Sequence, residues 1–138
     1  MSCMFRASGK EFDVDGFLKD SPWCPESIHH RGESKYPHRT DKLHEDAGFS
    51  LVASEAEFEF FDEQVADALV FLQNNREEIM RLASFIGLEF KGLDFGVKFT
   101  TDIAVRFFRF SPELSSAAGS LGLTLELSVY GVSQKDDS

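Results

Sequence analysis

Residues 121–129 alternate apolar and polar side chains almost without exception. A period of two places successive side chains on opposite faces of a β-strand. Residues 93–99 repeat this alternation, and the first residues of the chain do so in a shorter form. A strand buried on both faces would be apolar throughout, so these strands predict a sheet with helices on one face only. We expect Leu123, Leu125 and Leu127 to be buried together against those helices.

Three segments have helical spacing instead. Residues 13–20 begin with an aspartate, which commonly caps a helix N-terminus. Residues 62–86 place apolar side chains three and four positions apart, with Asn74 near the middle, which predicts two consecutive helices or one with a break. The last helix is predicted to begin at Ser111 and Pro112, because serine suits the N-cap and proline the first helical position.

Strands and helices in this order predict an α+β fold, with a mostly antiparallel four- to five-stranded sheet and helices packed on one face. We expect a ferredoxin-like topology, because units of helix, glycine and strand recur in the second half. One domain is predicted over residues 1–133, followed by a disordered polar tail at 134–138. Residues 21–47 show no periodicity and hold all four histidines, which predicts a long irregular loop with one short strand near Ile28.

The charge balance limits the classes of partner. The chain has 24 acidic and 14 basic residues, a formal net charge of −10. Because DNA-binding proteins neutralise phosphates with lysine and arginine, we expect no nucleic-acid partner. The longest apolar run is residues 68–72, far short of the roughly 20 residues that span a bilayer, so we expect no membrane insertion. The N-terminus does not predict a signal peptide and the two cysteines do not predict disulfides, so we expect a cytoplasmic protein.

A cluster of acidic residues is the first candidate site. It comprises Glu55, Glu57, Glu59, Asp62 and Glu63. If the segment is a strand, the three glutamates share one face. One interpretation is a solvated surface, or a helix start favoured by the helix dipole. The other is an anionic surface that binds a basic protein, as in small acidic bacterial immunity proteins that block cationic toxins. The sequence thus predicts an immunity-like or adaptor module that binds another protein.

Residues 23–44 hold a second candidate site. Its candidate ligand-binding residues are Trp23, Cys24, His29, His30, His38 and His44. Zinc binds cysteine and histidine, but these spacings match no paired zinc signature, so no metal ligand is assigned. The alternative function is a small-ligand or metal-binding module built on this segment.

Catalytic motifs are missing from the sequence. Cys24 with His29 or His44 is a conceivable nucleophile and base, but no oxyanion-hole signature accompanies them. No phosphate-binding loop, dinucleotide-binding glycine motif or H-E-x-x-H motif occurs. The sequence therefore predicts no catalytic residue, no cofactor and no enzymatic activity. Residues 106–110 read Arg-Phe-Phe-Arg-Phe. Strand-like alternation would place Arg106, Phe108 and Phe110 on one face and Phe107 and Arg109 on the other, which indicates either core packing or a stacking platform for bases.

The end of the chain has a recognisable pattern. It reads S-P-E-L at residues 111–114 and G-L-x-L-x-L-x-x-Y at residues 122–130. This pattern resembles the end of an uncharacterised bacterial domain-of-unknown-function family, and residues 25–27, 31–33 and 48–51 are also similar to that family. Ile28-His29 and Phe49 stand where the family often has tryptophan. The resemblance implies an α+β fold and no established activity, and it supplies no catalytic residue.

Overall fold

The structure, a computed structural model, describes residues 2–36, 38–100 and 104–132. Its strands are β1 (Cys3–Gly9), β2 (Ser27–His29), β3 (Ser34–Tyr36), β4 (Arg39–Leu43), β5 (Ala47–Ser54), β6 (Phe90–Thr100) and β7 (Thr124–Val132). Its helices are α1 (Val14–Lys19), α2 (Phe61–Asn74), α3 (Arg76–Ala83) and α4 (Pro112–Ser120). The polar tail predicted at residues 134–138 lies outside the described residues.

Five strands form one sheet in the order β2-β5-β1-β6-β7, and β3 pairs with β4 in a separate sheet. β1 is antiparallel to β5 and β6, and β2 is antiparallel to β5, whereas β6 and β7 are parallel. The predicted α+β class is confirmed, and the main sheet is mixed rather than purely antiparallel. The ferredoxin-like topology is not confirmed, because β6 and β7 are direct neighbours, whereas a split βαβ unit has another strand between them.

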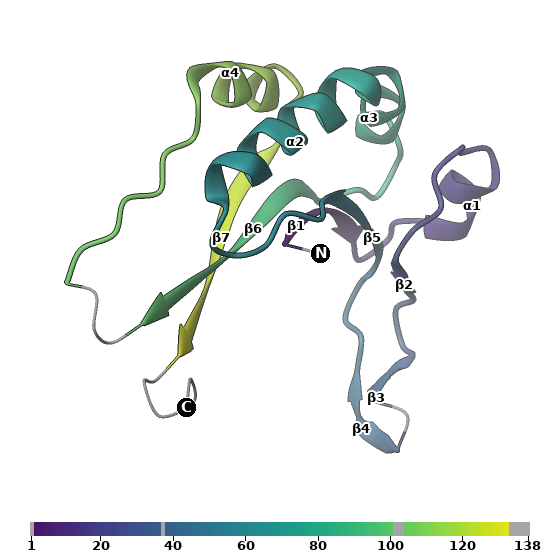
Figure 1. Cartoon of the computed structure of the whole chain (residues 1–138). Coiled ribbons are helices and arrows are strands. Elements are labelled where there is room, and N and C mark those ends of the chain that lie inside the picture. Colours follow the sequence, from purple (N-terminus) through teal and green to yellow (C-terminus); the bar gives the residue numbers. More distant parts are fainter. Residues whose placement is uncertain (1, 37, 101–103, 133–138) are drawn as a thin grey trace.

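The helices α2, α3 and α4 lie on one side of the main sheet (Figure 1). We call this side the helix-covered face and the opposite side the open face. Alternate residues of β1 and β6 are buried on the helix-covered face: Cys3, Phe5, Ala7, Leu93, Phe95 and Val97. The predicted alternation of these two strands is therefore confirmed.

The open face has polar contacts between strands. The Nη1 atom of Arg6 lies 3.0 Å from the Oδ2 atom of Asp94, and the hydroxyl of Ser128 donates to Oδ1 of Asp94 at 2.6 Å. These residues come from β1, β6 and β7. Because the buried carboxylate has both an ion-pair partner and a hydroxyl donor, its desolvation is compensated.

β6 and β7 continue beyond the end of β1. Cys3, the first residue of β1, is already paired with Phe95, five residues before β6 ends. Leu123 is buried and Leu125 half-buried, but Leu127 is 39% exposed. The prediction that all three leucines are buried is therefore wrong for Leu127. The physical reason is that the two strands extend past the helices as a ribbon (Figure 1).

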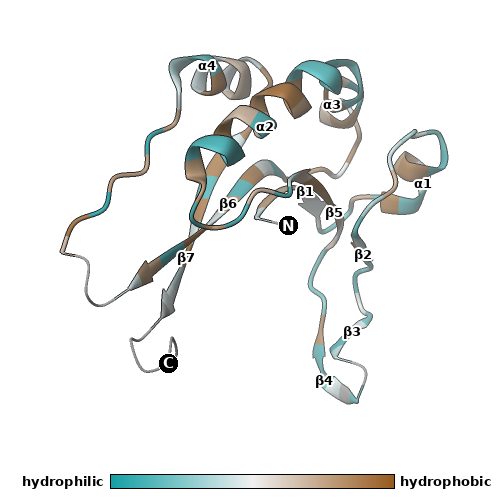
Figure 2. Ribbon diagram, in the orientation of Figure 1, coloured by the Kyte–Doolittle hydropathy of each residue, from teal (hydrophilic) through white to brown (hydrophobic). Residues whose placement is uncertain are grey.

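The segment 21–47 is more ordered than the sequence pattern predicts. The predicted short strand near Ile28 is confirmed as β2, but β3 and β4 also form here, so the prediction of an irregular loop is wrong. The described side chains of β3 are all exposed, and Figure 2 shows this hairpin mostly in hydrophilic colours. Because this hairpin buries little against the core, its sequence has no apolar alternation to reveal the strands.

The predicted helix signals are confirmed in their geometry. The Oδ1 atom of Asp13 accepts a hydrogen bond from the backbone N–H of Gly16 at 3.0 Å. The hydroxyl of Ser111 accepts one from the backbone N–H of Leu114 at 3.1 Å, and Pro112 follows in the first turn. The helical segment after residue 60 breaks at Asn75, which separates α2 from α3.

Candidate functional site

Residues 55–60 connect β5 to α2 and form loop and turn rather than a strand. We call them the acidic loop, because Glu55, Glu57 and Glu59 are all exposed on it. Asp62 and Glu63 follow in the first turn of α2, where carboxylates interact favourably with the helix dipole. We call the five acidic residues together the acidic patch.

The acidic loop lies against the open face of the β6–β7 ribbon. The Phe58 ring stacks on the ring of Tyr130 in β7, with centroids 5.4 Å apart and planes at 29°. The same ring covers Gly96 of β6 so closely that a Cβ atom there would lie 2.6 Å from Cε1 of Phe58. Only glycine at position 96 leaves room for this packing, so β6 fixes where the loop crosses the sheet.

A buried amide also holds the acidic loop in place. Gln64 of α2 is fully buried, and its Nε2 atom donates to the backbone oxygens of Gly96 at 2.9 Å and Glu57 at 3.3 Å. Its Oε1 atom has no hydrogen-bond partner among the described residues. The three elements α2, β6 and the acidic loop therefore meet at one side chain.

The three glutamates of the acidic loop border one hollow of about 400 Å³. Ser2, Phe58 and Lys98 also line it. Among the described residues of its lining, Lys98 alone is basic, and its Nζ atom lies 5.4 Å from the Phe58 ring centroid. The excess of carboxylates makes this hollow suited to a cationic group.

A second hollow, of about 320 Å³, adjoins the first at Glu59. Asp62 and Glu63 line it together with Arg106 and Phe107. The structure thus brings the five predicted acidic residues to two hollows that share one side chain. Their common surface was not evident from spacing alone, because a loop and a helix turn contribute to it rather than one strand.

The segment 106–110 shows the alternation that its sequence predicts, although it is extended chain rather than a strand. Phe108 and Phe110 pack edge-on against Phe61 of α2, with centroids 5.3 and 5.5 Å away. Phe107 points the other way and is 75% exposed. Two of the three rings are therefore packing residues.

Several large apolar side chains are exposed in the second half of the fold and on the acidic loop. They lie on β6, β7, the acidic loop and the segment before α4: Phe99, Leu127, Val129, Tyr130, Phe60, Val105 and Phe107. The sequence pattern did not predict them as surface residues, because alternation specifies the face of a strand but not how far the covering helices extend.

The residues of the second predicted site do not all come together. Trp23 is part of the aromatic core, with ring centroids 5.6 Å from Phe5 and 5.8 Å from Phe49, and its Nε1 donates to Asn75 at 2.8 Å. Trp23 therefore has a packing role, and its role as a ligand-binding residue stays a prediction. Cys24 is exposed and unpaired with any other cysteine.

The four histidines lie between residues 29 and 44, from β2 to the residues just before β5. His29 lies 2.8 Å from Asp46 and stacks on His44 at 4.6 Å, and His30 contacts two carboxylates. His38 is exposed near the hairpin tip. In the part of the chain that the structure describes, no three histidine, cysteine or carboxylate side chains are grouped to hold a metal ion.

His30 gives a testable pH effect. Hydrogen bonds to Asp15 and Glu33 raise its pKa above 6.5, whereas burial and the neighbouring His29 lower the pKa of His44. The contacts of charged His30 stabilise the fold below about pH 6.5, and this contribution is lost as the pH rises through its raised pKa. We expect an NMR titration to give His30 the higher midpoint, and Asp15→Asn to lower that midpoint only. Equal midpoints in the unmodified protein would contradict the contacts.

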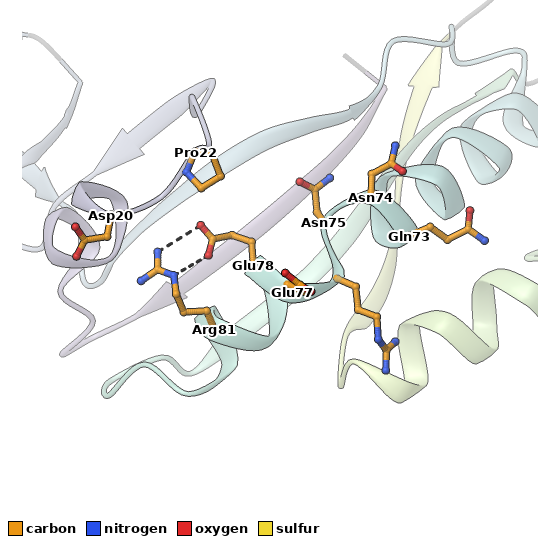
Figure 3. Close-up of a pocket in the computed structure, with 9 residues that line it drawn as sticks. Asp20, Pro22, Gln73, Asn74, Asn75, Glu77, Glu78 and Arg81 are labelled. Atoms are coloured by element: carbon orange, nitrogen blue, oxygen red, sulfur yellow. Dashed lines mark hydrogen bonds and ion pairs between the residues drawn. The ribbon is translucent and has the colours of Figure 1, made fainter.

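A larger hollow, of about 710 Å³, lies at the break between α2 and α3. Figure 3 shows the ion pair at its edge, in which Arg81 donates to Glu78 at 2.6 Å. Arg81 also donates to the backbone oxygen of Phe17 at 2.8 Å and covers its ring at 4.0 Å. Burial raises the pKa of Glu78, but hydrogen bonds from Arg81 and Ser21 outweigh this effect and lower it. These contacts hold α3 against α1.

Comparison of the chain with models of protein families found no match, and neither did comparison with curated proteins or with solved structures. The resemblance to the uncharacterised bacterial family therefore stays a prediction. No helix among the described residues has the length and apolar character needed to cross a membrane.

Proposed function

We propose that this chain is a non-enzymatic binding module, immunity-like or adaptor, that binds a basic protein through the acidic patch. The observation that supports it most directly is the convergence of three exposed glutamates on one hollow beside the Phe58–Tyr130 ring stack. Two further carboxylates border the adjoining hollow.

The composition of this surface suits a protein partner. Protein interfaces combine an apolar centre rich in aromatic residues with a polar rim. Here exposed Phe60, Phe107 and Tyr130 supply aromatic area, and the acidic patch supplies the charged margin. Complementary charge at such a margin steers association and discriminates among partners.

The rest of the chain also supports this class of function. The formal net charge of −10 disfavours a nucleic-acid partner. Cys3 and Cys24 are both free, as is usual in a reducing compartment, so we propose a cytoplasmic location. The scattered positions of the predicted ligand-binding residues give no support to the alternative ligand or metal module.

Substituting both Glu57 and Glu59 with glutamine tests the acidic patch. A pull-down at low salt from the cells that make the protein, followed by mass spectrometry, identifies candidate basic partners. For such a partner, we expect the double variant to associate roughly 3–10 times more slowly at low salt, because long-range attraction raises association rates. The difference should shrink as salt is added. Folding should be nearly unchanged, because both side chains are exposed.

The matched control is Glu26→Gln with Glu45→Gln. It removes the same charge from exposed positions just before β2 and between β4 and β5. If both double variants slow association equally, the effect comes from net charge alone. If the Glu57 and Glu59 double variant associates at the unmodified rate, the acidic patch is excluded as the binding surface.

A further inference from the structure

β7 is the last strand of the main sheet and, among the described residues, pairs on one side only. Its nine residues contain a single charged side chain, Glu126. Proteins usually protect an open strand edge with several charges, a proline, a bulge or a covering segment, because unpaired backbone groups readily bind another strand. β7 has no proline, and its pairing with β6 is regular from Thr124 to Val132.

The two faces of β7 differ in chemistry. On the helix-covered face, Leu127 is 39% and Val129 57% exposed, so apolar area is open to a neighbouring strand. On the open face lie Glu126 and Tyr130, whose register partners in β6 are Asp94 and Lys98. An added strand would therefore meet apolar side chains on one face, and a carboxylate and an aromatic ring on the other.

This edge is continuous with the acidic patch. Tyr130 of β7 stacks on Phe58 of the acidic loop, and Phe58 lies in the hollow that the three glutamates border. A segment bound along the far end of β7 would have these carboxylates beside it.

We propose that the open edge of β7 binds an extended strand of the basic partner, in which apolar residues alternate with lysine or arginine. This inference rests on the proposed function and specifies how the partner binds. The apolar side chains would pack on Leu127 and Val129, the basic side chains would face Glu126 and the acidic patch, and backbone hydrogen bonds would extend the sheet.

Charge complementarity selects this occupant over a second copy of the chain. Pairing of β7 with the same strand of a second copy would bring together two chains that each have a formal charge of −10. Like charges placed across an interface are unfavourable, whereas a basic strand relieves the same repulsion.

A synthetic nine-residue peptide that alternates valine and lysine is the probe. We expect saturable binding at low salt, with hydrogen-exchange protection of backbone amides in β7. A peptide of the same sequence with every backbone nitrogen methylated keeps its charges but loses its hydrogen-bond donors, and it should not protect β7. Protection by the methylated peptide, or binding of the first peptide without protection of β7, would overturn the proposal.

Val129→Glu separates strand addition from charge attraction. The substitution adds a negative charge, so attraction alone predicts equal or tighter binding of the peptide. Strand addition predicts weaker binding, by about tenfold, because an apolar contact is lost at the edge. Val105→Glu is the matched control: Val105 is 67% exposed and lies outside the sheet, so this variant should bind as well as the unmodified chain.

The outcomes distinguish this inference from the proposed function. If Val129→Glu binds the peptide as tightly as Val105→Glu, strand addition is excluded, while slower association of the Glu57 and Glu59 variant would still support the acidic patch. If Val129→Glu leaves peptide binding unchanged and the Glu57 and Glu59 double variant leaves association with a basic partner unchanged, both proposals fail. If β7 amides become protected without peptide as the protein concentration rises, a second copy occupies the edge and the basic strand is excluded.

Discussion

Replacing Phe95 with alanine should lower the free energy of unfolding by about 3–5 kcal/mol. Phe95 is fully buried on β6, with ring centroids 5.7 Å from Phe61 and 5.1 Å from Phe110. Removing the ring leaves a cavity between the sheet, α2 and the segment before α4, which these rigid neighbours fill only in part. Urea denaturation followed by circular dichroism measures the loss.

Phe107→Ala is the control for this prediction. It removes the same ring from a position that is 75% exposed, twelve residues later in the chain. We expect its free energy of unfolding to change by less than about 0.5 kcal/mol. Similar losses for the two variants would show that the burial of Phe95, or the exposure of Phe107, is wrong.

Gly96→Val should displace the acidic loop and lower stability by about 1–3 kcal/mol, because inserting carbon atoms into a packed site forces its neighbours to move. The first added atom would lie 2.6 Å from the Phe58 ring, so the ring must leave its stack on Tyr130. Hydrogen exchange should show faster exchange in residues 55–60, and association with a basic partner should slow.

Two further variants control this result. Gly131 of β7 has no atom within 4 Å of a built Cβ, so Gly131→Val should be nearly neutral. Combining Gly96→Val with Phe58→Ala removes the steric conflict and should recover part of the lost stability. If Gly96→Val retains the exchange pattern of the acidic loop, Phe58 does not pack over β6 as described.

The sequence predicted those elements whose signals are local. The alternation of β1 and β6, the cap residues Asp13 and Ser111, and the helix break beside Asn74 each depend on a few neighbouring side chains, and all were confirmed. The exposure of Leu127 was not predictable in this way, because it depends on where β1 and the helices end. The hairpin of β3 and β4 escaped prediction because its sequence carries no apolar period.

The candidate site, too, could be predicted from the sequence only in part. The acidic residues were evident from the sequence, but their neighbours are distant along the chain: Lys98 and Tyr130 follow Phe58 by 40 residues or more. The glycine at position 96 gave no local signal, because its requirement arises from a ring contributed by another segment. The packing of Trp23 against the core was missed for the related reason that an irregular segment can still supply a core side chain.

The two hydrogen bonds that Gln64 donates affect the entropy of binding. A surface loop that must become ordered when it meets a partner loses conformational freedom at that moment, by about 0.5–1.5 kcal/mol for each immobilised side chain. Here the Glu57 backbone is already tied to α2 and β6 by one buried amide, and the Phe58 ring is already stacked. Much of the ordering cost is therefore met during folding, and the glutamates face solvent on a preorganised loop.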